Sequence, residues 1–128
     1  MKVNKSTEWI EMAEYDIVSA KVMLKGGRYL YVGFLCHLSV EKMLKAIIAK
    51  DGTTPRKTHT LALLEELAGL QDTLTVEQKT LLAELQPLNI EARYSAYKDR
   101  IAAVLTEDYC RDIVKRTEAF LAWIKQLL

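Results

Sequence analysis

The chain contains two histidines, His37 and His59, and imidazole is the side chain whose unperturbed charge change lies nearest neutral pH. His37, Glu41 and Lys45 follow one another at intervals of four residues, so a helix aligns them along one ridge. On such a ridge an imidazole and an ammonium group could meet a phosphate. The other interpretation is a solvated row of side chains, in which the Glu41–Lys45 pair contributes only ~0.2–0.5 kcal/mol.

His59 lies at the start of a short expected helix, directly after Thr58. The first amides of a helix and its positive dipole end bind anions, so His59 is a second candidate ligand for a phosphate. The alternative is that the Thr-His pair only caps the helix.

A third candidate surface combines cations with aromatic rings, the combination that stacks a nucleobase and holds a phosphate. Its members are Arg93, Tyr94, Tyr97, Lys98 and Arg100. The structural alternative is that Arg93 pairs with a buried acid, such as Asp16 or Glu41, while the tyrosines pack the core. Both interpretations remain open at this stage.

Other site signatures are missing from the sequence: it has no Gly-rich phosphate loop, no HExxH, no Cys-x-x-Cys and no nucleophile elbow. We therefore expect no metal site, no cofactor and no self-contained catalytic residue. The two cysteines, Cys36 and Cys110, lie in apolar helical patterns and are expected to be buried free thiols.

The central element that positions these candidates is an expected helix over residues 29–50. Its second half carries an apolar face with Val40 and Leu44, and we expect Glu41, Lys42, Lys45 and Ala49 on the opposite face. Its first half has little polar surface. Four side chains there exceed what one bundle can cover, which predicts a homodimer: Tyr31, Phe34, Leu35 and Leu38.

Local signals mark the other helices. Ser6 or Thr7 is expected to cap a first helix that ends at Gly26-Gly27 and returns antiparallel to the central one. A short helix follows, with a stripe of Leu61, Leu64, Leu67 and Leu70. The capping box Thr75–Gln78 begins a fourth helix that ends near Gln86, because Pro87 disfavours helical geometry before it.

The last part of the chain divides into a segment without a clear period and a strongly periodic one. Residues 89–98 could be partly helical but are expected to form a structured loop. Thr106 then caps a final helix, with apolar positions at helical spacing from Cys110 to Leu128. The sequence therefore predicts an all-α protein, an up-and-down four-helix bundle with an additional short helix.

The composition agrees with a single domain over residues 1–128. Lysine plus arginine is 18 and aspartate plus glutamate is 17, so the net charge of +1 gives no overall attraction to nucleic acid or membranes. The longest uncharged run, residues 29–40, is too short to span a bilayer, and the first residues lack an apolar signal segment. A cytoplasmic location is expected.

Five sequence elements occur in an order that resembles the HEPN domain family across nearly the whole chain. They are Ala13-x-x-Asp16-x-x-x-Ala20, Gly27-Arg28-Tyr29, Val40-Glu41-Lys42-Met43-Leu44-Lys45-Ala46, Thr58-His59-Thr60-Leu61 and Ala92-Arg93-Tyr94. The resemblance implies a small helical bundle, usually dimeric and often encoded beside a minimal nucleotidyltransferase. It also implies either nucleotide binding or RNA cleavage.

The RNA-cleaving members of that family carry an arginine followed after four to six residues by a histidine. In this chain Arg28 precedes His37 by nine positions and Arg56 precedes His59 by three, while no histidine follows Arg93. Tyr97 stands where a histidine might have been, and an unperturbed tyrosine, with a pKa near ~10, is a poor base at neutral pH.

The departure from the arginine-to-histidine spacing favours a non-catalytic module. We expect the chain to bind a nucleotide, to act as the substrate-binding partner of a separately encoded nucleotidyltransferase, or to do both. The alternative is an RNA-cleaving toxin of a toxin–antitoxin pair, with a degenerate site built from Arg93, Tyr97 and one of the two histidines.

Overall fold

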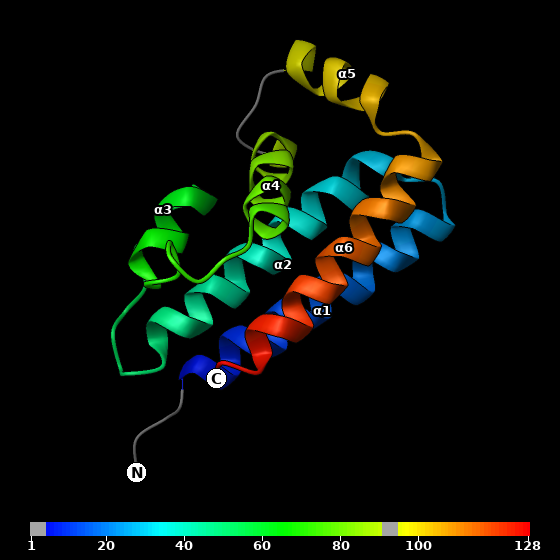
Figure 1. Ribbon diagram of the computed structural model, residues 1–128. Coiled ribbons are helices and arrows are strands. Elements are labelled where there is room, and N and C mark those ends of the chain that lie inside the picture. Colours follow the sequence, from blue (N-terminus) through cyan, green and yellow to red (C-terminus); the bar gives the residue numbers. More distant parts are fainter. Residues whose placement is uncertain (1–4, 91–94) are drawn as a thin grey trace.

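The computed structural model describes residues 5–90 and 95–128, with side chains described outside residues 95–97 (Figure 1). Within these residues there are six α-helices, one 3-10 helix and no strand, which confirms the all-α class. Three helices are long: α1 Lys5–Lys25, α2 Tyr29–Ala49 and α6 Glu107–Lys125. The shorter ones are α3 Leu61–Leu67, α4 Val76–Leu85, η1 Gln86–Leu88 and α5 Ser95–Val104.

Helices α1 and α2 form an antiparallel hairpin, as predicted. Gly27 adopts a left-handed conformation with φ of 72°, and the amide of Arg28 donates to the carbonyl of Met23 at 2.8 Å, which closes the end of α1. The expected cap at Ser6 is wrong. α1 is already helical at Lys5, and the Ser6 hydroxyl instead donates to the carbonyl of Ala46 at 2.8 Å, tying α1 to α2.

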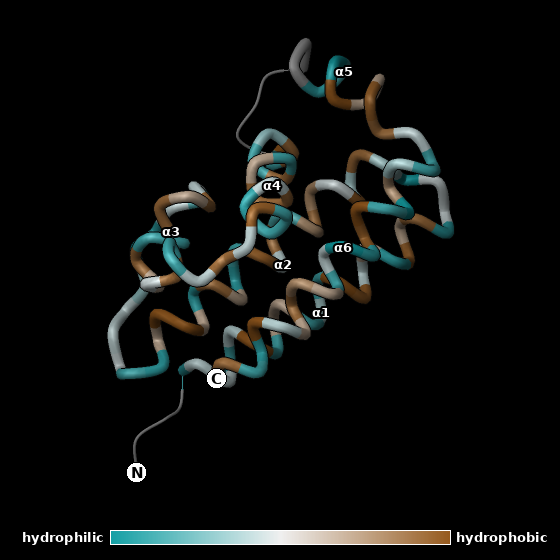
Figure 2. The backbone as a smooth tube through the Cα atoms, viewed as in Figure 1, coloured by the Kyte–Doolittle hydropathy of each residue, from teal (hydrophilic) through white to brown (hydrophobic). Residues whose placement is uncertain are grey.

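Helix α6 lies beside α1 and α2 and completes the long part of the bundle (Figure 1). Ion pairs between Lys21 and Glu118 and between Lys125 and Glu14 show that α6 is antiparallel to α1. Figure 2 shows hydrophobic residues recurring along all three helices. The predicted inward face of α6 is confirmed, since its buried residues are Cys110, Ile113, Val114, Thr117, Phe120, Leu121 and Ile124.

The shorter helices pack against α2 and at one end of the bundle. The capping box of α4 is confirmed, because the Thr75 side chain accepts from the Gln78 amide and the Gln78 side chain accepts from the Thr75 amide. Thr106 caps α6 as predicted. In α3 the predicted stripe is only partly right, because Leu67 is exposed.

The expected loop over residues 89–98 is wrong in its second part, where α5 begins at Ser95 and runs to Val104 (Figure 1). α5 is anchored near its end by Ile101 and by Leu105 just beyond it, both buried. Two apolar residues one turn apart do not establish a helical repeat, so the sequence pattern could not identify this helix. No helix in the described part of the chain is long and apolar enough to cross a membrane.

Candidate functional site

Glu41, in the middle of α2, is a carboxylate inside the protein, with 3% of the residue exposed. His37 and Lys45, four residues before and after it, are also buried. The expectation of a solvated row is therefore wrong, and so is the placement of Glu41, Lys45 and Ala49 on an outward face. The physical reason is that α2 is central: α3 and α4 contact it as well as α1 and α6.

Three cationic or imidazole side chains surround the Glu41 carboxylate. Its Oε1 atom lies 2.8 Å from Nδ1 of His59 and 3.4 Å from Nε2 of His37, and its Oε2 atom lies 3.1 Å from Nζ of Lys45. We call these four residues the Glu41 network. Burial alone raises the pKa of Glu41, but the contacts with His37, His59 and Lys45 outweigh that effect and lower it to about 2. The carboxylate is thus ionised at neutral pH.

His37 ties the network to α4 and does not reach the surface. Its Nδ1 lies 3.1 Å from the carbonyl oxygen of Leu85, and because a carbonyl only accepts, Nδ1 carries the hydrogen. Its Nε2 faces Glu41 at 3.4 Å without the alignment of a hydrogen bond. A ligand at the surface cannot contact His37 directly, so its part in any site is to support Glu41.

Lys45 is engaged in the interior as well. Its ammonium group contacts Glu41 and lies 5.5 Å from the centre of the Trp9 ring of α1, a cation–π distance. The Trp9 ring and the Glu41 carboxylate therefore hold the cation between α1 and α2, and Lys45 is not a surface ligand.

His59 is the member of the network that reaches solvent, with 63% of its side chain exposed. A carboxylate only accepts, so Nδ1 of His59 donates to Glu41 and Nε2 is left for solvent or a ligand. A buried carboxylate thus fixes both the tautomer and the orientation of an exposed imidazole, as the carboxylate of a catalytic triad does.

Gln86 holds the loop that carries His59, and sequence analysis did not identify it. Its Nε2 donates to the carbonyl of His59 at 3.3 Å, and its Oε1 accepts from the amide of Leu61 at 2.7 Å. The first amide of α3 is therefore already occupied and is not available to a ligand beside His59. The only signal in the sequence was a glutamine beside Pro87, which by itself indicates no contact with residue 59.

The aromatic and basic surface predicted around Arg93 lies largely outside the described residues, because Arg93, Tyr94 and the side chain of Tyr97 fall there. The two carboxylates considered as partners of Arg93 have other partners. Asp16 pairs with Lys42 at 2.6 Å, and Glu41 is surrounded as described above.

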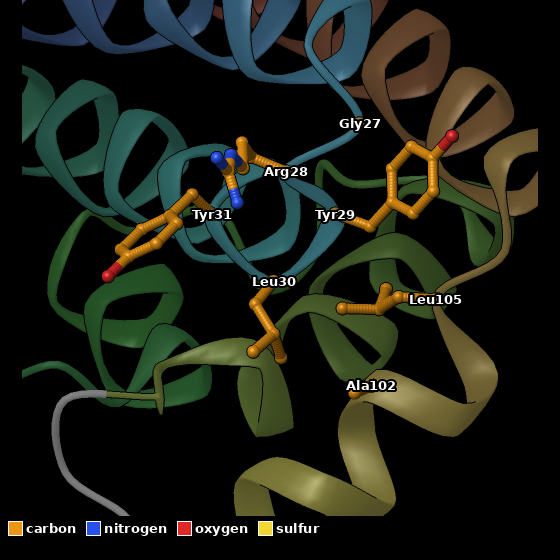
Figure 3. A pocket seen from close by; sticks show the side chains of 7 residues that line it. All are labelled: Gly27, Arg28, Tyr29, Leu30, Tyr31, Ala102 and Leu105. Carbon is orange, nitrogen blue, oxygen red and sulfur yellow. The ribbon is translucent and has the colours of Figure 1, made fainter.

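An open hollow of about 290 Å³ lies at the other end of α2, and Figure 3 shows the side chains around it. Its lining residues are Gly27, Arg28, Tyr29, Leu30, Tyr31, Ala102 and Leu105. Leu30 precedes Glu41 by eleven residues, about 16 Å along a helix, so the hollow and the Glu41 network are separate. As far as the structure describes the chain, its lining includes one arginine and two tyrosines but no carboxylate or histidine.

Among the described residues, no group of three or more histidine, cysteine, aspartate or glutamate side chains is placed to hold a metal ion. What the Glu41 network can do chemically is present one oriented imidazole, able to accept a proton or, once protonated, to donate to an anion.

A family model described as the HEPN domain matches residues 6–127. The crystal structure of TT1696 from Thermus thermophilus is similar, with a TM-score of 0.79 and 20% sequence identity, over 98% of this chain and 100% of that one. At this identity the likeness shows the fold. The search of curated proteins found no match.

Proposed function

The chain belongs to the HEPN domain family, and on that premise we propose that it is a non-catalytic module that binds a nucleotide, with His59 as a contact for the phosphate. The observation that carries this proposal is the Glu41–His59 pair, in which a buried, ionised carboxylate orients an exposed imidazole at 2.8 Å.

The free energy needed to desolvate the buried charges of the Glu41 network supports a binding role. A buried ion network contributes little net stability compared with apolar packing of the same volume, because its charges must be desolvated. What the network does supply is a fixed direction for the imidazole of His59. A ligand group that meets a pre-oriented side chain loses less conformational entropy on binding.

Positive charge near His59 favours an anionic ligand. Arg56 and Lys57 precede His59 in the same loop and are both exposed. A protonated imidazole beside two flexible cations can hold a phosphate, while the neutral ring accepts a hydrogen bond from a ribose hydroxyl or a base amine. A nucleotide offers all of these groups.

The test is thermal unfolding of the purified chain with a panel of nucleotides and with inorganic phosphate. A ligand at 100 times its Kd stabilises the native state by ~2.7 kcal/mol. We expect one nucleotide to raise the unfolding temperature of the wild type and of Lys115→Ala, which removes an exposed cation on α6. The same nucleotide should leave His59→Ala unchanged. Absence of any shift, or a full shift in His59→Ala, would refute the assignment.

We further propose that the bound nucleotide is presented to a separately encoded minimal nucleotidyltransferase. An exposed contact residue such as His59 leaves one side of the ligand open to a second protein. Co-purification of a nucleotidyltransferase with the tagged chain, retained in Lys115→Ala, supports this role. Recovery of the chain without such a partner from cells that encode one contradicts it.

A second candidate function is RNA cleavage as the toxin of a toxin–antitoxin pair, and it is favoured by the same Glu41–His59 geometry. A carboxylate-oriented imidazole is suited to act as a general base toward a 2′-hydroxyl group. The arginine-to-histidine spacing argues against it. Incubation of the purified chain with labelled RNA distinguishes the two functions. Cleavage that disappears in both His59→Ala and Glu41→Gln would establish a ribonuclease. Intact RNA supports the binding module.

A further inference from the structure

Helix α1 is apolar on two opposite faces, and only one of them is covered. The inner face packs into the core through Ala13, Ile17 and Ala20. The outer face exposes Tyr15 at 75%, Val18 at 58% and Val22 at 60%, with Met12 beside them. A helix that is hydrophobic on opposite sides is normally buried on both, so the outer face of α1 requires a partner.

The exposed residues follow the spacing of a coiled-coil seam. Steps of three and four residues alternate along the outer face, as they do between the a and d positions of heptads. The six residues at this spacing, which we call the α1 seam, are Glu8, Glu11, Tyr15, Val18, Val22 and Lys25. The apolar part of this seam runs from Tyr15 to Val22, about 10 Å along the helix, and charged residues continue the same line toward both ends of α1.

The α1 seam carries opposite charges at its two ends, which suits pairing with an antiparallel copy of itself. Glu8 and Glu11 lie at its start and Lys25 at its end, all exposed, and no ion pair of any of them is seen within residues 5–90 and 95–128. Two parallel α1 helices would place like charges together. Two antiparallel ones place Glu8 opposite the partner subunit's Lys25, Glu11 opposite the partner subunit's Val22, and Tyr15 opposite the partner subunit's Val18.

We propose that the α1 seam is the interface of a homodimer in which two α1 helices pack antiparallel about a two-fold axis. Each contact then occurs twice, as an isologous interface requires: the pairs of Tyr15 with the partner subunit's Val18 lie at its centre, and the pairs of Glu8 with the partner subunit's Lys25 lie at its ends. This differs from the surface expected from the sequence. In that segment of α2 only Tyr31 is exposed, whereas Phe34 is buried and Leu35 and Leu38 are half-buried within one chain.

The first test is sedimentation velocity at micromolar concentration, with circular dichroism to verify folding. We expect the wild type to be a dimer and Val18→Glu a folded monomer, because a charge is placed at the centre of the α1 seam. Val76→Glu is the matched control, since Val76 of α4 is also an exposed valine, and it should remain dimeric. A monomeric wild type, or a Val18→Glu dimer as tight as the wild type, would overturn the proposal.

A charge exchange tests the antiparallel direction. Glu8→Lys or Lys25→Glu alone turns two attractive contacts into repulsive ones and should weaken the dimer roughly ten-fold. The double variant carrying both changes restores two opposite-charge pairs and should dimerise like the wild type. A double variant no tighter than either single variant contradicts the antiparallel arrangement. Loss of the dimer in Tyr31→Glu but not in Val18→Glu would show that α2, and not α1, forms the interface.

Discussion

The Glu41 network should make the stability of the protein fall in acid by an amount that one substitution removes. The pKa of Glu41 is lowered from its ordinary 4.5 to about 2, because His37, His59 and Lys45 outweigh the effect of burial. The folded state therefore holds this carboxylate ionised over a range where the unfolded chain protonates it. Above pH 4.5 its contribution is complete, and as the pH falls toward about 2 the contribution is lost.

The size of the effect follows from the shift. At 1.36 kcal/mol per unit of pKa, a lowering from 4.5 to about 2 means that the folded protein is about 3 kcal/mol more stable with Glu41 ionised than with Glu41 protonated. That is a large share of the ~5–15 kcal/mol typical of folded domains. Glu41→Gln should cost a similar amount at neutral pH, because it leaves the buried Lys45 without its counter-charge.

Urea unfolding of wild type and Glu41→Gln across the acid range measures this directly. The difference in free energy of unfolding between them should be about 3 kcal/mol at neutral pH and should shrink toward zero as the pH approaches 2. The control is Glu118→Gln, which removes a half-exposed carboxylate paired with Lys21 and should change stability by less than ~1 kcal/mol. A wild-type-to-Glu41→Gln difference that stays constant with pH would refute the reasoning.

Two further predictions follow from the packing around α2. Burial raises the pKa of the Cys36 thiol to about 12 and that of Cys110 to about 11, so both should resist a thiol reagent at mildly alkaline pH and react fully in denaturant; rapid labelling of the folded protein would contradict this. Gly33 is closely approached by two leucines, since a Cβ atom placed there would lie 3.2 Å from Leu88 Cδ1 and 3.4 Å from Leu105 Cδ1. Gly33→Val should therefore lower the free energy of unfolding by ~1–3 kcal/mol in chemical denaturation, and an unchanged value would show that Leu88 and Leu105 move away at no cost.

Helix ends were predictable where their determinants are local. Thr75 and Gln78 satisfy each other's amides within one turn, and Thr106 does the same for α6, so the sequence alone indicated both starts. Ser6 failed as a cap because its hydroxyl bonds to Ala46, forty residues away. At the start of α5 a loop was preferred to a partly helical segment, because the buried anchors Ile101 and Leu105 depend on neighbours that the sequence pattern does not show.

The residues of the candidate site could also be predicted only where they depend on local sequence. The spacing of His37, Glu41 and Lys45 was visible as a helical ridge, and His59 was identified as a separate candidate. The contact between His59 and Glu41 could not be predicted from the sequence, because it depends on the position of a loop that Gln86 holds in place. The side chains expected to be solvated, Glu41 and Lys45, proved to be buried because α1, α3, α4 and α6 all contact α2.

By itself, the sequence determined the helical class, the hairpin turn at Gly27, the capped starts of α4 and α6 and the inward face of α6, because each depends on residues within a turn or on a simple period. Only the tertiary structure decided that Glu41 is buried among three partners, that His59 alone of these four residues reaches solvent, and that α1 keeps an uncovered apolar face. Burial depends on which helices pack around α2 and α1, and that is a property of the whole chain rather than of any segment.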